Sequence, residues 1–277
     1  MESLAVGDLS KMRTVPEAVV RYALELGDAS IAMNDLIGRR IALRFEGLIQ
    51  CVACGRKTKK SFNQGYCYPC FQRLAQCDSC VMSPEKCHYD AGTCRDPEWG
   101  ERNCMTDHVV YLANSTGVKV GITRGSQVPT RWMDQGASAA VVFARTSKRH
   151  LAGLVEVALK QFVTDRTQWQ RLLKGAPEPL DLFEKRSELA AEAGDALAAL
   201  QERFGLQALQ LADDDQLFEF AYPVEEYPAK VKSLALEKLG EVEGQLLGIK
   251  GQYLILSSGV INVRKYSGHH VELLADA

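Results

Sequence analysis

Long apolar runs are missing from this sequence. Its first residues, MESLAVGDLSKMRTV, have neither the apolar stretch nor the small-residue cleavage site of a secretory signal. No later run approaches the roughly 20 residues that a membrane-spanning helix needs. We therefore expect a cytoplasmic protein with no membrane partner. In a reducing cytoplasm, nine cysteines favour metal binding over disulfide bonds.

Internal repeats, low-complexity tracts and a large net charge are also missing. The 277 residues suffice for one large domain or two small ones, and a net charge of -2 does not by itself indicate a polyanionic partner. Basic residues nevertheless gather around the first cysteines, which predicts a local basic face. These residues are Arg39, Arg40, Arg44, Arg56, Lys57, Lys59, Lys60 and Arg73.

The order of patterns along the chain predicts an α+β fold. Strand-like alternation at both ends predicts that residues 20–50 share a sheet with residues 243–273 in one small β-barrel-like domain. A cysteine-rich module and an α/β unit are then inserted between the two ends. The predicted segments are a β-rich N-terminal segment (1–50), a cysteine-rich module (51–107), an α/β unit (108–175), a helical segment (176–240) and a C-terminal β segment (241–277).

Four cysteines form two C-x-x-C pairs with twelve residues between them: Cys51, Cys54, Cys67 and Cys70. Each pair can place two sulfur atoms on one ion, and Gly55 suits a tight turn after the first pair. Tetrahedral zinc needs four thiolates about 2.3 Å from the ion, which two such pairs supply. The pattern predicts a closed, structural zinc site, without which this segment, poor in apolar residues, should not fold.

The other five cysteines follow closely and offer ligands for a second metal. Cys77 and Cys80 form a third C-x-x-C pair, whose partners would be two of the group Cys87, His88, Cys94 and Cys104. Zinc is the predicted second ion. An iron–sulfur cluster on three or four of these thiolates, acting as a redox sensor, is the alternative, because both centres need thiolates in a loop-rich segment.

Short motifs run in a fixed order through residues 108–172. HVVYLA and KVGIT indicate two strands, with Tyr111 in the first and Gly121 in the second. Arg131 follows in PTRWMDQGA, and Glu156 lies in LAGLVEVALKQFV, which indicates an amphipathic helix. This arrangement resembles the GIY-YIG endonuclease superfamily, and especially its phage-type branch, whose second motif begins with lysine, here Lys119. As a whole, the chain resembles an uncharacterised bacterial family that joins a zinc ribbon to such a unit.

The resemblance implies Mg²⁺-dependent cleavage of a phosphodiester bond. Such a reaction needs a metal on the phosphate, an activated water and stabilisation of the developing charge. Glu156 would hold Mg²⁺, and Arg131 would neutralise a phosphate oxygen. Tyr111 would orient or deprotonate the water, helped by Lys119.

The alternative hypothesis is a protein without catalytic activity. Val109 and Val110 occupy the Gly and Ile positions of the first motif, and Lys160 stands where the branch often has histidine. A degenerate nuclease fold would then bind nucleic acid or a protein partner without cleaving it. In that case Arg131 could simply pair with Asp134.

Two surfaces are candidates for contact with DNA or RNA. The first is the basic loop between the C-x-x-C pairs, although such a loop can also be merely solvated. It carries Arg56, Lys57, Lys59 and Lys60. The second is a face of the C-terminal β segment, where a tyrosine could instead fill the core. It carries Lys250, Tyr253, Arg264 and Lys265.

Overall fold

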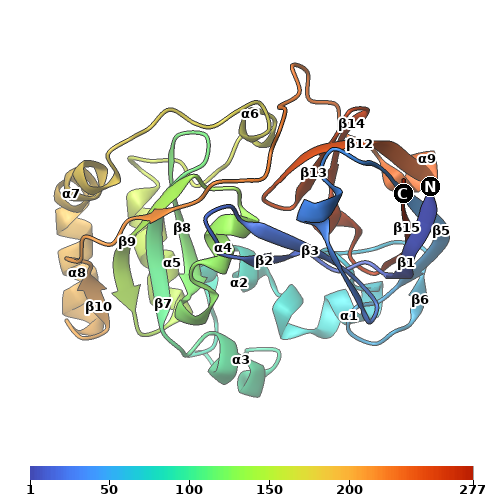
Figure 1. The fold of residues 1–277 in the computed structure, drawn as a ribbon. Coiled ribbons are helices and arrows are strands. Elements are labelled where there is room, and N and C mark those ends of the chain that lie inside the picture. The colour runs from blue at the N-terminus through green and yellow to red at the C-terminus, as the bar shows by residue number, and fades with distance from the viewer. Residues whose placement is uncertain (277) are drawn as a thin grey trace.

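The structure of the protein, a computed structural model, describes residues 1–276 and has a mixed α/β fold. The α/β unit lies at the left of Figure 1 and a large sheet at the right, with the cysteine-rich module below and between them. The chain termini lie close together on the large sheet, where the amino group of Met1 is 3.6 Å from the Asp276 carboxylate. No helix within residues 1–276 is long and apolar enough to cross a bilayer.

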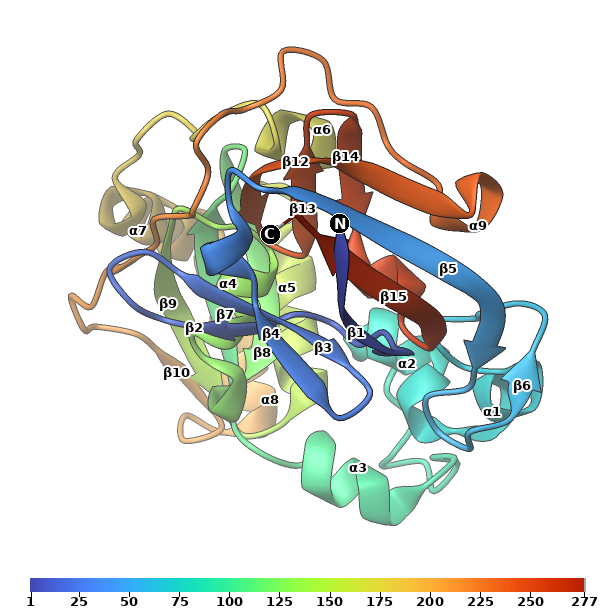
Figure 2. The ribbon, with the colours of Figure 1, turned by 45° about the vertical axis from the view of Figure 1, so that its right-hand side comes forward.

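Both ends of the chain build the large sheet. Its order is β1-β15-β5-β12-β13-β14, with β6 paired to β5. β5 is antiparallel to β12 and to β15, which confirms that the two ends share a sheet. Figure 2 shows β5 running alongside β15. The strands are β1 (Glu2–Asp8), β5 (Arg40–Gln50), β6 (Lys57–Thr58), β12 (Glu241–Lys250), β13 (Tyr253–Leu256), β14 (Gly259–Asn262) and β15 (His269–Ala275).

The expected small barrel is not closed. β12 pairs with β5 through residues 241–245 and with β13 through residues 246–250, so the sheet turns within this one strand. β1 and β14 remain as its two edges, since neither pairs with the other. Its core is completed by a separate three-stranded sheet, which buries Leu24 and Leu26 against Val242. That sheet comprises β2 (Arg13–Val15), β3 (Arg21–Leu26) and β4 (Ala29–Ala32), followed by the short helix η1 (Met33–Leu36).

The α/β unit has a second sheet, in the order β10-β9-β7-β8 with β11 beside β9. The two strands and the helix expected from HVVYLA, KVGIT and LAGLVEVALKQFV are present as β7, β8 and α5. All seven residues of β7 are buried, because α5 covers one face of the sheet and α4 lies on the other side of the β7 strand. The elements are β7 (His108–Asn114), β8 (Val118–Arg124), η4 (Gly125–Gln127), α4 (Thr130–Asp134), β9 (Ala139–Thr146) and α5 (Arg149–Leu159).

The helical segment 176–240 does not pack as a unit of its own. Leu189 and Leu197 lie in the same core as Val110 and Leu151, so α7 and α8 belong with the α/β sheet. β10 and β11 then add to the edge of that sheet along β9. The elements of this segment are α7 (Leu182–Glu192), α8 (Gly194–Phe204), β10 (Leu209–Leu211), β11 (Phe218–Glu219) and α9 (Leu236–Leu239), and α6 (Trp169–Leu172) precedes it.

The cysteine-rich module is made of short helices and loops with few apolar contacts. Its first part has a core of three cysteines, Cys51, Cys67 and Cys70, packed with Tyr66 and Leu74. The module contacts the large sheet through the pairing of β6 with β5, and it contacts the α/β unit through η3, which packs against α5. The elements are α1 (Tyr68–Arg73), η2 (Ala75–Cys77), α2 (Ser79–Met82), η3 (Pro84–Lys86) and α3 (Pro97–Asn103); η5 (Val263–Tyr266) lies in the large-sheet domain.

Candidate functional site

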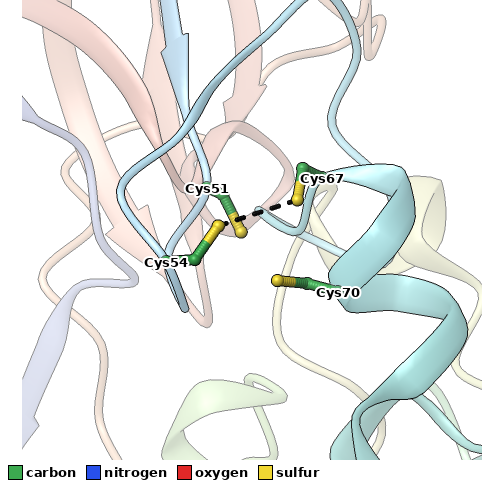
Figure 3. A group of neighbouring side chains, drawn as sticks. All are labelled: Cys51, Cys54, Cys67 and Cys70. Carbon is green, nitrogen blue, oxygen red and sulfur yellow. Dashed lines mark hydrogen bonds between the residues drawn. The ribbon is translucent and has the colours of Figure 1, made fainter.

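The first two C-x-x-C pairs form one compact cluster. Cys51 follows the end of β5, and Cys54 lies in the turn that the Gly55 N–H closes by donating to the Cys51 carbonyl. Cys67 caps the start of α1, where Pro69 favours helix initiation, and Cys70 lies in the first turn. The four sulfur atoms point toward a common centre (Figure 3) and all lie within 4.8 Å of one another.

The spacing of these sulfur atoms suits tetrahedral zinc. The Cys54 and Cys67 sulfur atoms are 3.8 Å apart. Four thiolates about 2.3 Å from one ion occupy a tetrahedron whose edge is about 3.8 Å. This cluster of four cysteines could therefore hold a metal ion.

The acid–base properties of the same thiols also point to a cation. Burial raises the pKa of Cys51, but hydrogen bonds from the backbone near Cys67, Ala53 and Cys54 outweigh it and lower that pKa to about 6. Burial and the neighbouring thiols raise the pKa of Cys70 to about 12. A cation among these thiols would stabilise their thiolate forms.

The later cysteines are arranged differently from the expected third C-x-x-C pair. One pocket is lined by Cys80, Cys87, Cys94 and Cys104. Cys77 is outside its lining, because this buried thiol, at the end of η2, lies near Asn63 and Arg95. The structure thus does not bring Cys77 to the pocket that Cys80 lines, and a metal shared by Cys77 and Cys80 stays a prediction. A second group of metal-ligating atoms within 4.8 Å of one another comes from Asp78, Cys80 and His88.

The four residues assigned by resemblance to catalysis line one cavity of about 140 Å³. Tyr111 on β7 and Lys119 on β8 both donate to the side-chain oxygen of Gln135, at 2.9 and 2.5 Å. Arg131 and Gln135 lie one turn apart at α4, and Glu156 enters from α5. Sequence reasoning missed Gln135, although its i,i+4 spacing from Arg131 was a usable signal.

Close packing between β7 and β8 shapes this cavity. Tyr111 and Gly121 are direct cross-strand partners. A Cβ atom at Gly121 would lie 2.6 Å from the Tyr111 hydroxyl, so only glycine leaves room for the ring. Burial raises the pKa of Tyr111, which keeps the phenol protonated. Tyr111 therefore acts better as a hydrogen-bond donor than as a base.

Several cationic side chains lie near Arg131. Burial lowers the pKa values of Lys119, Arg149 and Arg264, and repulsion from Arg131 lowers each of them further. The Lys119 value falls to about 8. Within residues 1–276 no carboxylate pairs with Arg131, because Asp134 instead accepts from Lys11 at 2.6 Å. The expected alternative of an Arg131–Asp134 pair is wrong, and an anion would relieve the repulsion.

Glu156 lies at another wall of the same cavity. Burial raises the pKa of its carboxylic acid. Lys160 lies 3.3 Å from the Glu156 carboxylate and 3.0 Å from that of Asp165. Two carboxylates thus already share one cation at this end of the cavity.

Comparison with known proteins gives the family but no activity. The model of a family described as a protein of unknown function, DUF2797, matches residues 38–271. The chain belongs to this family. It matches no curated protein and no solved structure. The likeness to GIY-YIG nucleases and to zinc ribbons therefore still rests on the residues named above.

In this DUF2797 chain two further pockets share lining residues with the cavity, and we call the three together the groove. Arg131 also lines two adjoining hollows, of about 330 and 610 Å³. Together these hollows are walled by the α/β unit, by Gln64 and Tyr66 of the cysteine-rich module, and by Tyr253 and Arg264 of the large-sheet domain. The groove is therefore a junction of all three parts of the fold.

The residues of the two surfaces expected to bind nucleic acid differ in how far they are exposed. The basic loop is exposed at all four of its cations, Arg56, Lys57, Lys59 and Lys60. On the C-terminal face, Arg264 and Tyr253 line the groove, but Lys250 does not. Lys250 is buried, donates to the Gly175 carbonyl at 3.0 Å and lies over the rings of two tyrosines, so its place on a binding face was wrong.

Proposed function

We propose that this protein is a metal-dependent phosphodiester hydrolase that acts on nucleic acid. One observation carries the proposal: Lys119, Arg131 and Glu156 meet in a single cavity at the end of a positively charged groove. Uncompensated cations bind the phosphate backbone, while a carboxylate offers a hard oxygen ligand to a divalent ion. The site thus combines a phosphate-binding region with a metal-binding group.

The carboxylates at the end of the cavity fit a divalent cation. Glu156 and Asp165 both contact the Lys160 amine, so the position between them is already suited to positive charge. The Lys160 side chain is 32% exposed, so it can swing into solvent when an ion replaces it. Oxygen donors with space for water are the ligands that Mg²⁺ prefers. When bound there, the ion would polarise the phosphate and neutralise part of its charge.

The protein's own side chains supply the other parts of the reaction. Arg131 binds a phosphate oxygen and stabilises the charge that develops on it. Neutral Lys119 accepts the proton of the attacking water while one of its N–H groups stays bonded to Gln135. The water oxygen forms a bond to phosphorus, and the bond from phosphorus to the leaving sugar oxygen breaks. Tyr111 holds Gln135, and through it the orientation of Lys119.

The first cysteine cluster has a structural part in this proposal. Four thiolates would close the coordination of zinc and leave no position for a substrate. The zinc instead fixes the loop that presents Arg56, Lys57, Lys59 and Lys60 to the phosphate backbone. Contacts of this kind bind without reading sequence.

Replacing Arg131 with alanine should weaken binding to a short oligonucleotide about tenfold. The slope of the logarithm of the affinity against the logarithm of the salt concentration should also fall by about one, because about one fewer counterion is released. Arg145→Ala is the matched control. Arg145 is exposed on β9, pairs with Asp214 and lies outside the groove. Fluorescence anisotropy across a salt series measures both effects. Equal affinities for the two variants would contradict the assigned phosphate site.

The cleavage rate should rise with pH up to about 8 and then level off. Burial, with repulsion from Arg131, lowers the pKa of Lys119 to about 8. The amine is charged below that pH and cannot accept a proton, so the rate should increase about tenfold per pH unit there. Lys119→Arg stays charged at every accessible pH and should lose activity throughout. An unchanged pH profile in Lys119→Arg would exclude this lysine as the base.

A second function is favoured by one observation, the ion pair between Glu156 and Lys160. If that pair persists when nucleic acid binds, the carboxylate is not free for a metal. The groove would then bind nucleic acid without cleaving it. Isothermal titration of the unchanged protein with Mn²⁺ distinguishes the two functions, because a catalytic site should bind the ion and Glu156→Gln should weaken that binding, whereas a persistent ion pair should prevent it.

A further inference from the structure

A second set of four thiols surrounds a common space in the cysteine-rich module. Cys80, Cys87, Cys94 and Cys104 come from α2, from the loop after η3, from the loop before α3 and from the end of α3. The rest of the lining combines polar or charged side chains with less polar residues: Asp78, His88 and Arg95 with Ala75, Tyr89, Trp99 and Gly100. The thiols are free, so no disulfide bond accounts for their convergence.

The spacing of these thiols differs from that of the first cluster. Atoms of Cys51, Cys54, Cys67 and Cys70 all lie within 4.8 Å of one another. Over residues 1–276, no such group is formed by Cys87, Cys94 and Cys104. Tetrahedral zinc requires the close spacing, because all four thiolates bind one ion. An iron–sulfur cluster allows the wider spacing, because its thiolates are distributed over different irons.

A small ion bound by Asp78, Cys80 and His88 is a poorer explanation. The Asp78 carboxylate already pairs with the Arg95 guanidinium at 2.7 Å. The Nδ1 atom of His88 lies 2.8 Å from the Thr93 hydroxyl, and its Nε2 atom lies 3.4 Å from Asp78. These polar groups satisfy one another, and a guanidinium at this position repels a divalent ion.

We propose that Cys80, Cys87, Cys94 and Cys104 bind an iron–sulfur cluster. The four thiolates supply the complete ligand set that common clusters take. Asp78, His88 and Arg95 form an ion-pair network beside the cluster and are not ligands. None of the four ligands lines the cavity of the hydrolase proposed above.

The cluster would connect the module to α5. The Arg149 N–H, at the start of α5, donates to the Cys104 carbonyl at 2.8 Å. The Arg149 guanidinium donates to the carbonyl of Val81, next to Cys80, at 2.7 Å. Further along α5, a Cβ atom on Gly153 would lie 2.6 Å from Pro84 of η3, so the two segments are in direct contact. The four ligands thus hold the loops that position α5.

The full chain, purified without oxygen, should contain iron and acid-labile sulfide in equal amounts, about one zinc ion and a broad visible absorbance. Cys94→Ala should lose the iron, the sulfide and the colour but keep the zinc, which also shows that the first cluster is folded. Cys77→Ala is the matched control and should keep all of them, because Cys77 lies outside the pocket.

Three results would overturn the proposal. The first is a colourless protein with two zinc ions. The second is a protein that takes up no iron after anaerobic incubation with ferrous iron and sulfide. The third is iron that remains in Cys94→Ala at the level of Cys77→Ala, because that iron is bound elsewhere.

Discussion

Replacing Glu156 with glutamine should reduce the rate of metal-dependent cleavage by about a thousandfold, because the carboxylate that would hold the ion is lost. A metal ion stabilises a transition state of this kind by several kcal/mol. The fold should not suffer. Burial raises the pKa of Glu156, so the folded chain already disfavours the charged carboxylate. Glutamine removes that charge, and Lys160 keeps its contact with Asp165. Initial rates under single-turnover conditions, with melting curves of both proteins, measure the two effects.

Glu192→Gln is the control for this change. Glu192 ends α7 on the outside of the α/β unit and should leave the rate unchanged. A Glu156→Gln protein that cleaves at the original rate would remove Glu156 from the mechanism. If the melting temperature of the variant is much lower, the loss of rate reflects unfolding. Asp165→Asn then tests the same cation position, because Asp165 is the exposed second carboxylate there.

Replacing Cys67 with serine should release the zinc and unfold the first part of the cysteine-rich module. Cysteines form most of the local core, which contains Cys51, Cys67 and Cys70 with only Tyr66 and Leu74 beside them. A bound metal would therefore take the place of apolar burial here. Structural zinc binds zinc-finger peptides with an apparent free energy of about 10–16 kcal/mol at pH 7. Losing a binding free energy of this size would destabilise the module by more than the burial of its small core can offset.

Zinc content and protease sensitivity measure this loss. Cys67→Ser should be cut in the loop around Lys59, which is exposed even in the folded protein but is held by the cluster at both ends. Cys77→Ser should keep the zinc and resist the protease, because Cys77 lies in neither cysteine group. A Cys67→Ser protein with a full zinc equivalent and an unchanged cleavage pattern would show that the four cysteines do not bind the ion together.

Local patterns explain which parts of the fold could be predicted. β7, β8 and α5 each carry their own periodicity, and the two C-x-x-C pairs specify their geometry within a few residues. The shared sheet of the two ends was also predictable, because both ends alternate like strands. Pairing of β9 with β10 and β11 was not, since those partners are more than sixty residues away and only two or three residues long.

Side-chain environments explain most of the errors at the candidate sites. Lys250 looks exposed in the sequence, but the Gly175 carbonyl and the rings of Tyr222 and Tyr227 satisfy its amine in the core. Cys77 matches the spacing of a metal ligand, but it does not line the pocket that Cys80 lines. Neither outcome follows from spacing, because each depends on segments far away along the chain.

Hydrolysis of phosphodiester bonds in the Glu156 cavity can be measured by incubating the purified chain with end-labelled DNA and RNA. We expect shortened fragments of at least one of them when Mg²⁺ is added, and none when the ion is chelated. Intact DNA and RNA after incubation with Mg²⁺, from a protein that carries its zinc and binds the oligonucleotide, would contradict it.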